Sequence, residues 1–281
     1  MPEPTVSIIT VSLNAAAFIE DTIRSVLSQT YPALEYIIID GGSTDGTVET
    51  IRKYDSRLAY WHSRRDRGLA HAFNLGLAQA RGDWLVYLNA DDYFQGPEVV
   101  EGMAPQLQAH ADAEVVFGQV ALIPRRGLAP GESPAIYGGP WRWQRFRFVC
   151  TIPHQAAFTR RRYFDRVGSF NEDLALAMDY EHYLRAGPRL AAVFVPQMVS
   201  VMRGGGASLN NVIPTLREWR LAQSVNQAAN PLLIWGNFLA RSSLCLVRKK
   251  LGGLLRGGEG RRGDCSPGKA PGQSGNKLPL P

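Results

Sequence analysis

Cysteine is scarce in this chain, and its three cysteines are too widely spaced for a zinc site. They lie far apart among 281 residues with no Cys-x-x-Cys pair, which indicates a reducing compartment. The N-terminus lacks a basic segment and a small-residue cleavage site, so we expect no secretion signal and a cytoplasmic protein. No internal repeat is visible. With 45% hydrophobic residues, the chain can bury a full core and fits one large domain or one domain with an appendage.

Acidic residues are few at the C-terminal end, and this explains the net charge of +6. Residues 241–281 contain nine Lys or Arg and two acids, which leaves 22 basic and 23 acidic residues in the first 240. A near-neutral body with a basic extension favours attachment to an anionic surface over a nucleic-acid groove across the fold. We therefore expect no nucleic-acid partner.

The N-terminal half alternates short apolar runs with amphipathic segments. Asp45 is the expected N-cap of one helix, and Gly82 is expected to close another. The alternation predicts an α/β fold with a Rossmann-like, mostly parallel sheet flanked by helices. The apolar runs predict strands at 6–13, 35–40, 58–61 and 84–88. The helical spacing predicts a helix from Ile19, a second over 46–54 and a third from Leu69.

Two acidic turns follow strands of this predicted sheet. Asp40 begins the turn Asp-Gly-Gly-Ser-Thr-Asp-Gly, and Asp91 and Asp92 follow the run 84–88. Both turns should share one crevice, because the carboxyl ends of parallel strands meet at one edge. Neighbouring carboxylates repel each other, and a hard divalent cation held partly by substrate phosphates is a common remedy. The pair of turns therefore predicts a site for a metal and a nucleotide, in preference to two ordinary turns.

The alternation of strand and helix patterns becomes less regular after residue 120. The segment 124–140 is rich in glycine and proline and predicts a long functional loop. Residues 141–148 interleave arginines with aromatic residues, and two interpretations stay open: an acceptor groove, or aromatic packing with the arginines in solvent. Strands are expected over 156–159 and 192–195, with a helix over 178–185 between them.

From about Val6 to Ser208, these ordered signals resemble the inverting nucleotide-sugar glycosyltransferases of family 2, which have the GT-A fold and include many bacterial enzymes of cell-surface glycan synthesis. The resemblance implies a nucleotide-sugar donor, with a UDP-sugar expected, and a divalent metal, Mn²⁺ or Mg²⁺. We divide the chain into a GT-A catalytic domain at 1–210, a C-terminal amphipathic helical region at 211–255 and a disordered basic tail at 256–281.

The resemblance also implies individual site residues. Asn89-Ala90-Asp91 stands in the place of the family's Asp-x-Asp motif, so Asp91 is the expected metal ligand and Asp92 a second one. Asn89 departs from the motif, and its neutral amide is a weaker ligand for a hard cation. The implied nucleotide-binding set is Thr10, Asp40, Ser43, Arg65, Asp66, Asn89 and Ala90.

Asp179 is the implied catalytic base, since it stands where many family members carry Glu-Asp at the start of a helix. The sequence there reads Met-Asp-Tyr-Glu, so Glu181 is a rival. Two helical residues so spaced point in different directions, and we prefer Asp179. His154 is a candidate acceptor-side contact or a structural histidine, and Arg203 a candidate diphosphate donor or part of a Gly-rich hinge.

The C-terminal region predicts an amphipathic helix. Its apolar stripe comprises Ala240, Leu244, Val247, Leu251 and Leu254, and its basic residues fall off that stripe. Such a helix suits the interface of an anionic membrane, which would place the protein peripherally on the inner face of the cell membrane. The alternative, packing on the catalytic domain, stays open.

The expected function is metal-dependent transfer of one sugar, with inversion, to a glycan or polyprenyl-linked acceptor. A single transfer is expected because the Gln-x-x-Arg-Trp signature of processive family members is absent. A nucleotidyltransferase is the enzymatic alternative, although it would normally carry a Gly-rich basic loop where this chain has Asn14-Ala15-Ala16-Ala17. The other alternative is a non-enzymatic module that binds membrane or nucleic acid.

Overall fold

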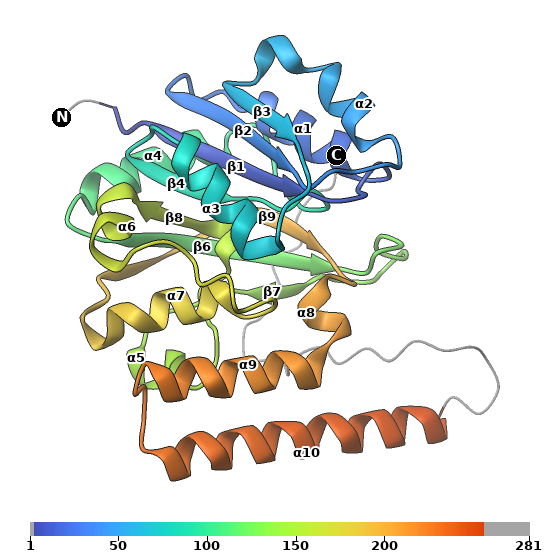
Figure 1. The fold of residues 1–281 in the computed structure, drawn as a ribbon, viewed down its shortest axis with the longest axis vertical. Coiled ribbons are helices and arrows are strands. Elements are labelled where there is room, and N and C mark those ends of the chain that lie inside the picture. Colours follow the sequence, from blue (N-terminus) through green and yellow to red (C-terminus); the bar gives the residue numbers. More distant parts are fainter. Residues whose placement is uncertain (1–2, 256–281) are drawn as a thin grey trace.

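A computed structural model of the chain describes residues 3–255, with side chains as far as Val247, and contains one central sheet (Figure 1). The strand order is β3-β2-β1-β4-β8-β6-β9-β5, with β7 paired to β6. The strands are β1 (Val6–Ser12), β2 (Leu34–Asp40), β3 (Tyr60–Ser63), β4 (Trp84–Tyr87), β5 (Tyr93–Phe94), β6 (Val115–Ile123), β7 (Ala135–Tyr137), β8 (Ala157–Arg160) and β9 (Ala192–Arg203).

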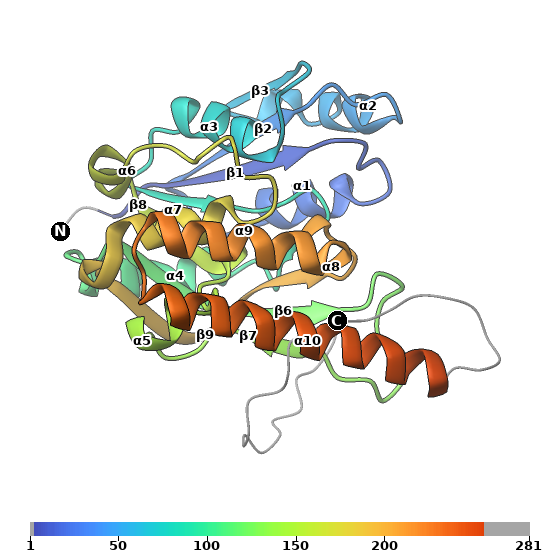
Figure 2. The same ribbon diagram turned by 60° about the horizontal axis from the view of Figure 1, so that its bottom comes forward.

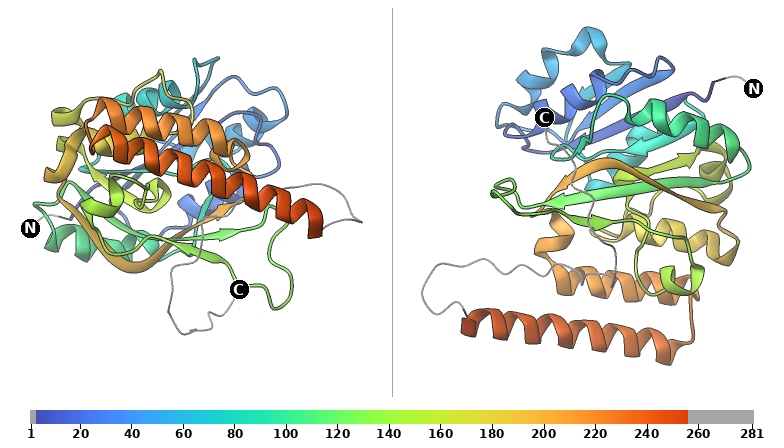
Figure 3. Two further views of the ribbon diagram at one scale, coloured as in Figure 1. Left: turned by 90° about the horizontal axis from the view of Figure 1, so that it is seen from below. Right: turned by 180° about the vertical axis from the view of Figure 1, so that it is seen from behind.

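Helices cover both faces of the sheet, and the views from the front and from behind place α3 and α4 on opposite faces (Figures 1 and 3). The α-helices are α1 (Ile19–Leu27), α2 (Thr47–Arg52), α3 (Leu69–Gln79), α4 (Val99–Ala109), α5 (Trp143–Phe146), α6 (Arg161–Val167), α7 (Met178–Ala186), α8 (Ala207–Asn210), α9 (Val212–Val225) and α10 (Pro231–Leu255). Short 3₁₀ turns are η1 (Asp55–Arg57), η2 (His154–Ala156) and η3 (Gly187–Arg189).

The first four strands in sheet order, β3-β2-β1-β4, are parallel. Ser12 of β1 pairs with Asp40 of β2, which in turn pairs with Ser63 of β3. The carboxyl ends of these strands therefore lie level at one edge of the sheet. The other half is mixed, because β8 runs antiparallel to both β4 and β6 while β9 is parallel to β6.

Side chains alternate along the strands and build one core on each face. On β1, Ile9 and Val11 belong to the core under α3 and α7, whereas Val6 and Ile8 belong to the core under α1 and α4. A strand buried on both faces has to be apolar throughout, which is why β1 and β2 are continuous apolar runs. The two cores fix the sheet between two helical layers and leave its edges for the site.

The C-terminal helices form a further layer outside α7. Figure 2 shows α9 and α10 lying side by side. Arg220 of α9 stacks over Trp235 of α10 at 4.2 Å, Arg241 of α10 stacks over Trp219 of α9 at 5.5 Å, and Ile234 is buried between the helices. Cation–π pairs of this kind add roughly 0.5–2 kcal/mol each. Among the described residues, no helix is long and apolar enough to cross a membrane.

The expected α/β architecture with a C-terminal helical extension is confirmed, but several local expectations are wrong. The loop expected over 124–140 contains β7, and β9 extends far beyond 192–195. The N-cap of α2 is Gly46, although Asp45 accepts the N–H of Thr47 at 3.1 Å. Gly82 does not close α3, because the helix ends at Gln79 and its C-cap is Ala80. The backbone of Gly82 instead approaches β1 so closely that a Cβ there would lie 2.6 Å from Ser7 Oγ.

The segment 141–148 packs through its aromatic side chains. Phe146 is fully buried against Trp141 and Tyr180, while Arg142 and Arg145 are exposed. This arrangement agrees with the interpretation of aromatic packing with arginines in solvent for two of the three arginines, whereas Arg147 is half-buried and stacks over Phe148 at 4.9 Å. The tail expected to be disordered, 256–281, lies outside the described residues.

Candidate active site

Asp40 ends β2 in the middle of three neighbouring strand ends. The hydroxyls of Ser12 and Ser63 donate to its carboxylate at 2.8 and 2.6 Å. The hydroxyl and N–H of Ser43 and the N–H of Gly42 also donate, so five hydrogen bonds reach a side chain without exposed surface. Burial alone would raise the pKa of Asp40, but the hydrogen bonds outweigh it and hold the pKa below its ordinary value. Asp40 is an ionised anchor for the turn after β2.

The resemblance to family 2 implies that Asp40 contacts the base of the nucleotide, and this anchoring bears on that expectation. A carboxylate offers about four lone-pair sites, and here five donors already use them. The contact between Asp40 and the base stays a prediction. The hydrogen bonds that Asp40 accepts are explained by its role in holding the turn after β2. Thr10 likewise has no exposed surface, and its hydroxyl accepts from Tyr36 at 3.0 Å. That burial speaks against direct nucleotide contact by Thr10.

The turn after β3 packs onto the turn after β2. A Cβ at Gly41 would lie 2.5 Å from Asp66 Oδ2, so only glycine leaves room for that carboxylate. Asp66 also accepts the N–H of Gly68 at 2.9 Å, and Arg65 beside it is exposed. The structure thus brings Ser43, Arg65 and Asp66 to one edge of the sheet, as expected of a nucleotide site.

The acidic turn after β4 separates its two carboxylates. Asp91 faces outward with a quarter of its side chain exposed, whereas Asp92 is buried. Asp92 accepts from Asn89 Nδ2 at 3.3 Å, Gln155 Nε2 at 3.1 Å and the backbone N–H of Arg203 at 3.1 Å. Burial first, and then the charge of Asp91, raise the pKa of Asp92 to about 7. Asp92, expected as a metal ligand, is therefore turned into the protein, and Ala90 is buried beside it.

Two arginines lie at this turn. Arg203, the last residue of β9, donates to the backbone oxygen of Asp91 at 2.9 Å and to Asp21 at 2.6 Å. Its guanidinium also stacks over Phe18 and is therefore committed to holding the turn. Arg125, from the loop between β6 and β7, lies 4.0 Å from the Asp91 carboxylate, and its guanidinium is 4.5 Å from the centre of the same Phe18 ring. Sequence reasoning missed Arg125, because only the fold brings its loop to Asp91.

Asp179 lies in the first turn of α7 and faces the same site. Its Oδ2 is 2.9 Å from His154 Nδ1, and its Oδ1 accepts the N–H of Tyr180 at 2.7 Å. His154 Nε2 in turn lies 3.2 Å from Asn89 Nδ2. Burial would raise the pKa of Asp179, but hydrogen bonding, first of all to His154 and then to the backbone N–H of Tyr180, holds it below the ordinary value. A hydrogen-bonded chain thus connects the predicted base to the turn after β4.

Glu181, the rival of Asp179, points elsewhere. It is buried beside Arg185 at 3.1 Å and accepts from Asn226 at 3.2 Å, next to α9. None of these contacts involves the acidic turn. The structure therefore separates the two carboxylates and gives Glu181 a structural environment.

The residues present fit a metal only in part. Among the described residues, no group of three or more His, Cys, Asp or Glu side chains is arranged to hold an ion. Mg²⁺-like cations, however, are commonly held by one or two carboxylates together with substrate phosphates and water. Asp91 satisfies that requirement, since its carboxylate is partly exposed at a strand end.

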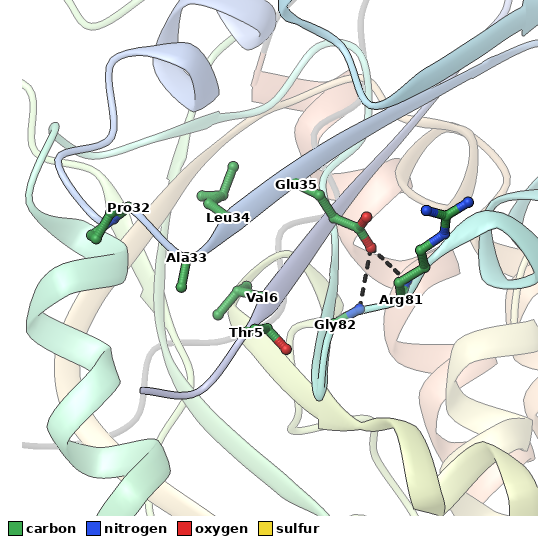
Figure 4. A pocket seen from close by; sticks show the side chains of 8 residues that line it. All are labelled: Thr5, Val6, Pro32, Ala33, Leu34, Glu35, Arg81 and Gly82. Carbon is green, nitrogen blue, oxygen red and sulfur yellow. Dashed lines mark hydrogen bonds between the residues drawn. The ribbon is translucent and has the colours of Figure 1, made fainter. Parts of the chain in front are cut away.

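Two cavities lie at different places on the described part of the molecule. A cavity of about 270 Å³ beside the acidic turn is lined by Asp21, Arg24, Tyr93 and Arg203. A second, of about 290 Å³, lies at the opposite, amino-terminal edge of β1 and β2 (Figure 4). There, Glu35 already accepts from Ser7 Oγ and from the N–H groups of Arg81 and Gly82. The one carboxylate of this second cavity is thus already used within the protein, and the cavity lies away from the acidic turns.

Solved structures define the class of this fold. S. aureus TarS in complex with UDP-GlcNAc superposes with a TM-score of 0.60 at 18% identity, covering 78% of this chain and 66% of that one. The mannosyltransferase PcManGT from Pyrobaculum calidifontis, in complex with GDP-Man and Mn²⁺, gives a TM-score of 0.59 at 18% identity, covering 92% and 82%. The fold is that of the GT-A glycosyltransferases.

Sequence comparisons give the family. The profile described as "Glycosyl transferase family 2" matches residues 7–168. An uncharacterized glycosyltransferase of Mycobacterium tuberculosis is 34% identical over 189 residues, or 65% of this chain and 69% of the relative. A PGL/p-HBAD biosynthesis glycosyltransferase of Mycobacterium bovis is 28% identical over 218 residues, or 76% and 82%. The chain belongs to glycosyl transferase family 2 and is an enzyme, so the two alternative functions are set aside.

Proposed function

We propose that this enzyme transfers a single sugar from a nucleoside-diphosphate sugar, a UDP-sugar by expectation, to a glycan or polyprenyl-linked acceptor of the cell envelope, with inversion at the anomeric carbon. The PGL/p-HBAD relative supports the envelope context, and the UDP-GlcNAc complex of TarS supports the donor class. The acidic turn and Asp179, joined through Asn89 and His154, are the observation that carries the proposal.

Asp91 is the residue proposed to hold Mn²⁺ or Mg²⁺. The Mn²⁺ bound to the mannosyltransferase supports this proposal. When bound, a divalent cation would act as a Lewis acid that neutralises the leaving diphosphate. Asp91 is suited to the role because it alone of the adjacent pair has exposed surface, while Asp92 holds the turn from inside.

Asp179 is proposed as the base. It would take the proton of the acceptor hydroxyl while that oxygen bonds to the anomeric carbon, on the face opposite the diphosphate. The bond from the anomeric carbon to the diphosphate oxygen breaks in the same step, and the nucleoside diphosphate leaves with that electron pair. A positioned base of this kind contributes about 10²–10⁴-fold to the rate.

Kinetics and product stereochemistry test the assignment. Asp179→Asn should lower kcat by about 10²-fold or more while donor affinity stays nearly unchanged, because the group acts on the acceptor's proton in the transition state. Glu181→Gln is the matched control and should retain kcat in the folded fraction. NMR of the product should show the inverted anomer. A retained anomer would overturn the single displacement, and loss of kcat only in Glu181→Gln would overturn the base.

We also propose that the enzyme attaches peripherally to an anionic membrane through α10, in line with the location on the inner face of the cell membrane that the sequence predicts. Seven of the large apolar side chains of α10 are exposed, one of which, Trp235, also stacks on Arg220 of α9, while Ile234 and Cys245 are buried. The helix contains no acid, and its basic residues Arg248, Lys249 and Lys250 suit anionic headgroups, whereas Arg241 stacks on Trp219 of α9. Its C-terminal end lies on the same side of the molecule as the carboxyl ends of β1 and β6, where a lipid-linked acceptor would enter (Figures 1 and 2). The exposed side chains are Leu232, Leu233, Trp235, Leu239, Leu244, Leu246 and Val247.

Vesicle sedimentation tests this attachment. Replacing Leu239, Leu244 and Val247 by Ser should abolish binding to vesicles of phosphatidylglycerol and phosphatidylcholine. It should change the unfolding free energy by no more than about 0.5 kcal/mol per substitution, because all three side chains are exposed. The control, Ile234→Ser on the buried face, should cost about 2–5 kcal/mol. Undiminished vesicle binding by the triple variant would contradict the membrane assignment. So would a wild-type protein that is a dimer in solution and that the triple substitution converts to a monomer, because the apolar face would then be covered by a second copy of the chain.

A further inference from the structure

Four side chains form a continuous path through the site, and two of them have no role in the proposed reaction. Asn89 Nδ2 lies 3.3 Å from Asp92 Oδ2 and 3.2 Å from His154 Nε2, and His154 Nδ1 lies 2.9 Å from Asp179 Oδ2. The path crosses from the turn after β4, through η2, to the first turn of α7. Asn89 and His154 therefore mediate between the metal side and the base side of the site.

The direction of each hydrogen bond follows from the two ends of the path. An ionised Asp179 can only accept, so His154 Nδ1 must carry the hydrogen that lies between them. In a neutral ring, Nε2 then holds a lone pair and can only accept. Asn89 supplies the donor, because its amide nitrogen carries two hydrogens, one for His154 and one for Asp92.

The orientation of the Asn89 amide supports this assignment. Asn89 Oδ1 is buried and accepts no hydrogen bond within the described part of the chain. Reversing the amide would pair Oδ1, which cannot donate, with the acceptor oxygen of Asp92 and with His154 Nε2. The observed orientation satisfies both neighbours at the cost of one unused oxygen.

We propose that Asn89 and His154 are positioning residues: Asn89 fixes the Nδ1-protonated, neutral tautomer of His154, and His154 fixes the carboxylate of Asp179 for the acceptor hydroxyl. The inference rests on the proposed role of Asp179 as base. With Oδ1 held by the Tyr180 N–H and Oδ2 held by His154, that carboxylate cannot rotate, and one oriented lone pair on each oxygen is left free. Holding a reacting group in one geometry lowers the entropic part of the barrier.

The same argument explains the amide in place of the first acid of the family motif. An Asp at position 89 could only accept, so His154 would need hydrogens on both nitrogens and would become a cation. A cationic ring against Asp179 would neutralise the charge that the base needs and make it a weaker proton acceptor. A second carboxylate would also face the buried Asp92. The neutral Asn89 thus matches the histidine at position 154.

A set of variants tests the proposal. An Asn at 154 places its amide N–H near the position of Nδ1, whereas a Gln reaches toward that of Nε2. His154→Ala and His154→Gln should lower kcat roughly 10–100-fold, the range found when outer partners of catalytic groups are removed, and His154→Asn should recover most of it. The KM for the donor should stay unchanged in all three, and thermal melts report the folded fraction.

Nitrogen-15 NMR of the imidazole supplies a readout that a purely structural histidine would not give. The wild-type ring should carry its proton on Nδ1 only, and Asn89→Asp should protonate both nitrogens and lower kcat. A wild-type proton on Nε2, or equal kcat losses in His154→Ala and His154→Asn, would overturn the inference.

Asp179→Asn separates this inference from the proposed function. If it loses turnover while His154→Ala keeps it, the base stands and the positioning role fails. If Asp179→Asn keeps turnover while His154→Ala loses it, His154 is itself the base and both ideas fail.

Discussion

The turns after β2 and β4 both bury one aspartate at a strand end, yet the two carboxylates have opposite pKa shifts. Asp40 receives five hydrogen bonds, which outweigh its burial and lower its pKa. Asp92 receives three hydrogen bonds and has the charge of Asp91 beside it, so burial dominates and raises its pKa to about 7. In the first turn, hydrogen bonds compensate the buried negative charge of Asp40. The second turn keeps an excess of negative charge, which a bound cation would reduce.

The largest effect should come from removing the exposed charge of the second turn. Asp91→Asn should lower kcat/KM by roughly 10²–10³-fold, because the cation site loses its protein carboxylate, a loss of several kcal/mol in the transition state. The variant should remain folded, since Asp91 is partly exposed. Activity can be measured with the nucleotide sugar that best raises the melting temperature in the presence of Mn²⁺. Full activity of the variant in chelator-treated buffer would refute the metal role of Asp91.

The next largest effect is on the unfolding free energy, and it comes from replacing each of the two buried carboxylates in turn. Asp40→Asn turns an acceptor into a donor that faces Ser12, Ser63 and the Ser43 turn, and should cost about 3 kcal/mol of unfolding free energy. Asp92→Asn should cost about 1 kcal/mol or less at pH 7, because its carboxyl readily takes a proton there. Urea unfolding at pH 7 measures both. Equal losses would show that the two sites do not differ as proposed.

The smallest effect is a pH dependence specific to Asp92. Its folded-state pKa of about 7 lies above the unfolded value, so the folded protein takes up a proton that the unfolded chain does not as the pH falls from 8 to 5. Stability should therefore rise by at most about 1.4 kcal/mol per pH unit below 7, relative to Asp92→Asn. The contribution of Asp40 should persist in this window, because its lowered pKa means it is lost only as the pH falls through that lower value. A constant difference between wild type and Asp92→Asn would contradict the raised pKa.

The alternation of strands and helices was predictable where burial on both faces imposes an apolar run. β1, β2 and β4 are runs of this kind, and their carboxyl ends lie at one edge as expected. β7 was missed because it is only three residues long and pairs with β6, so its order depends on a neighbour and not on its own sequence. Gly82 was misassigned for a related reason, since close contact with Ser7, and not a helix end, requires glycine there.

The site was predictable in its residue types but not in the direction of each side chain. Asp91 and Asp92 are adjacent in a turn, where no strand or helix period tells which one faces outward. Helix geometry predicts that Asp179 and Glu181 point in different directions, and the structure directs them to different neighbours; the preference for Asp179 came from the resemblance to the family. The contact between His154 and Asp179 spans 25 positions and depends on how η2 meets α7, which no local pattern encodes.

The three partners of Asp92 also bear on the order in which the protein assembles. Gln155 is 63 positions further along the chain and Arg203 is 111 positions further, at the last strand of the sheet. Contacts between such distant segments form slowly, because a long loop must close before they contribute any stability. During synthesis, β1 to β4 can pair long before Arg203 leaves the ribosome. The candidate active site should then be one of the last regions to become ordered, and activity should appear only after most of the secondary structure has formed.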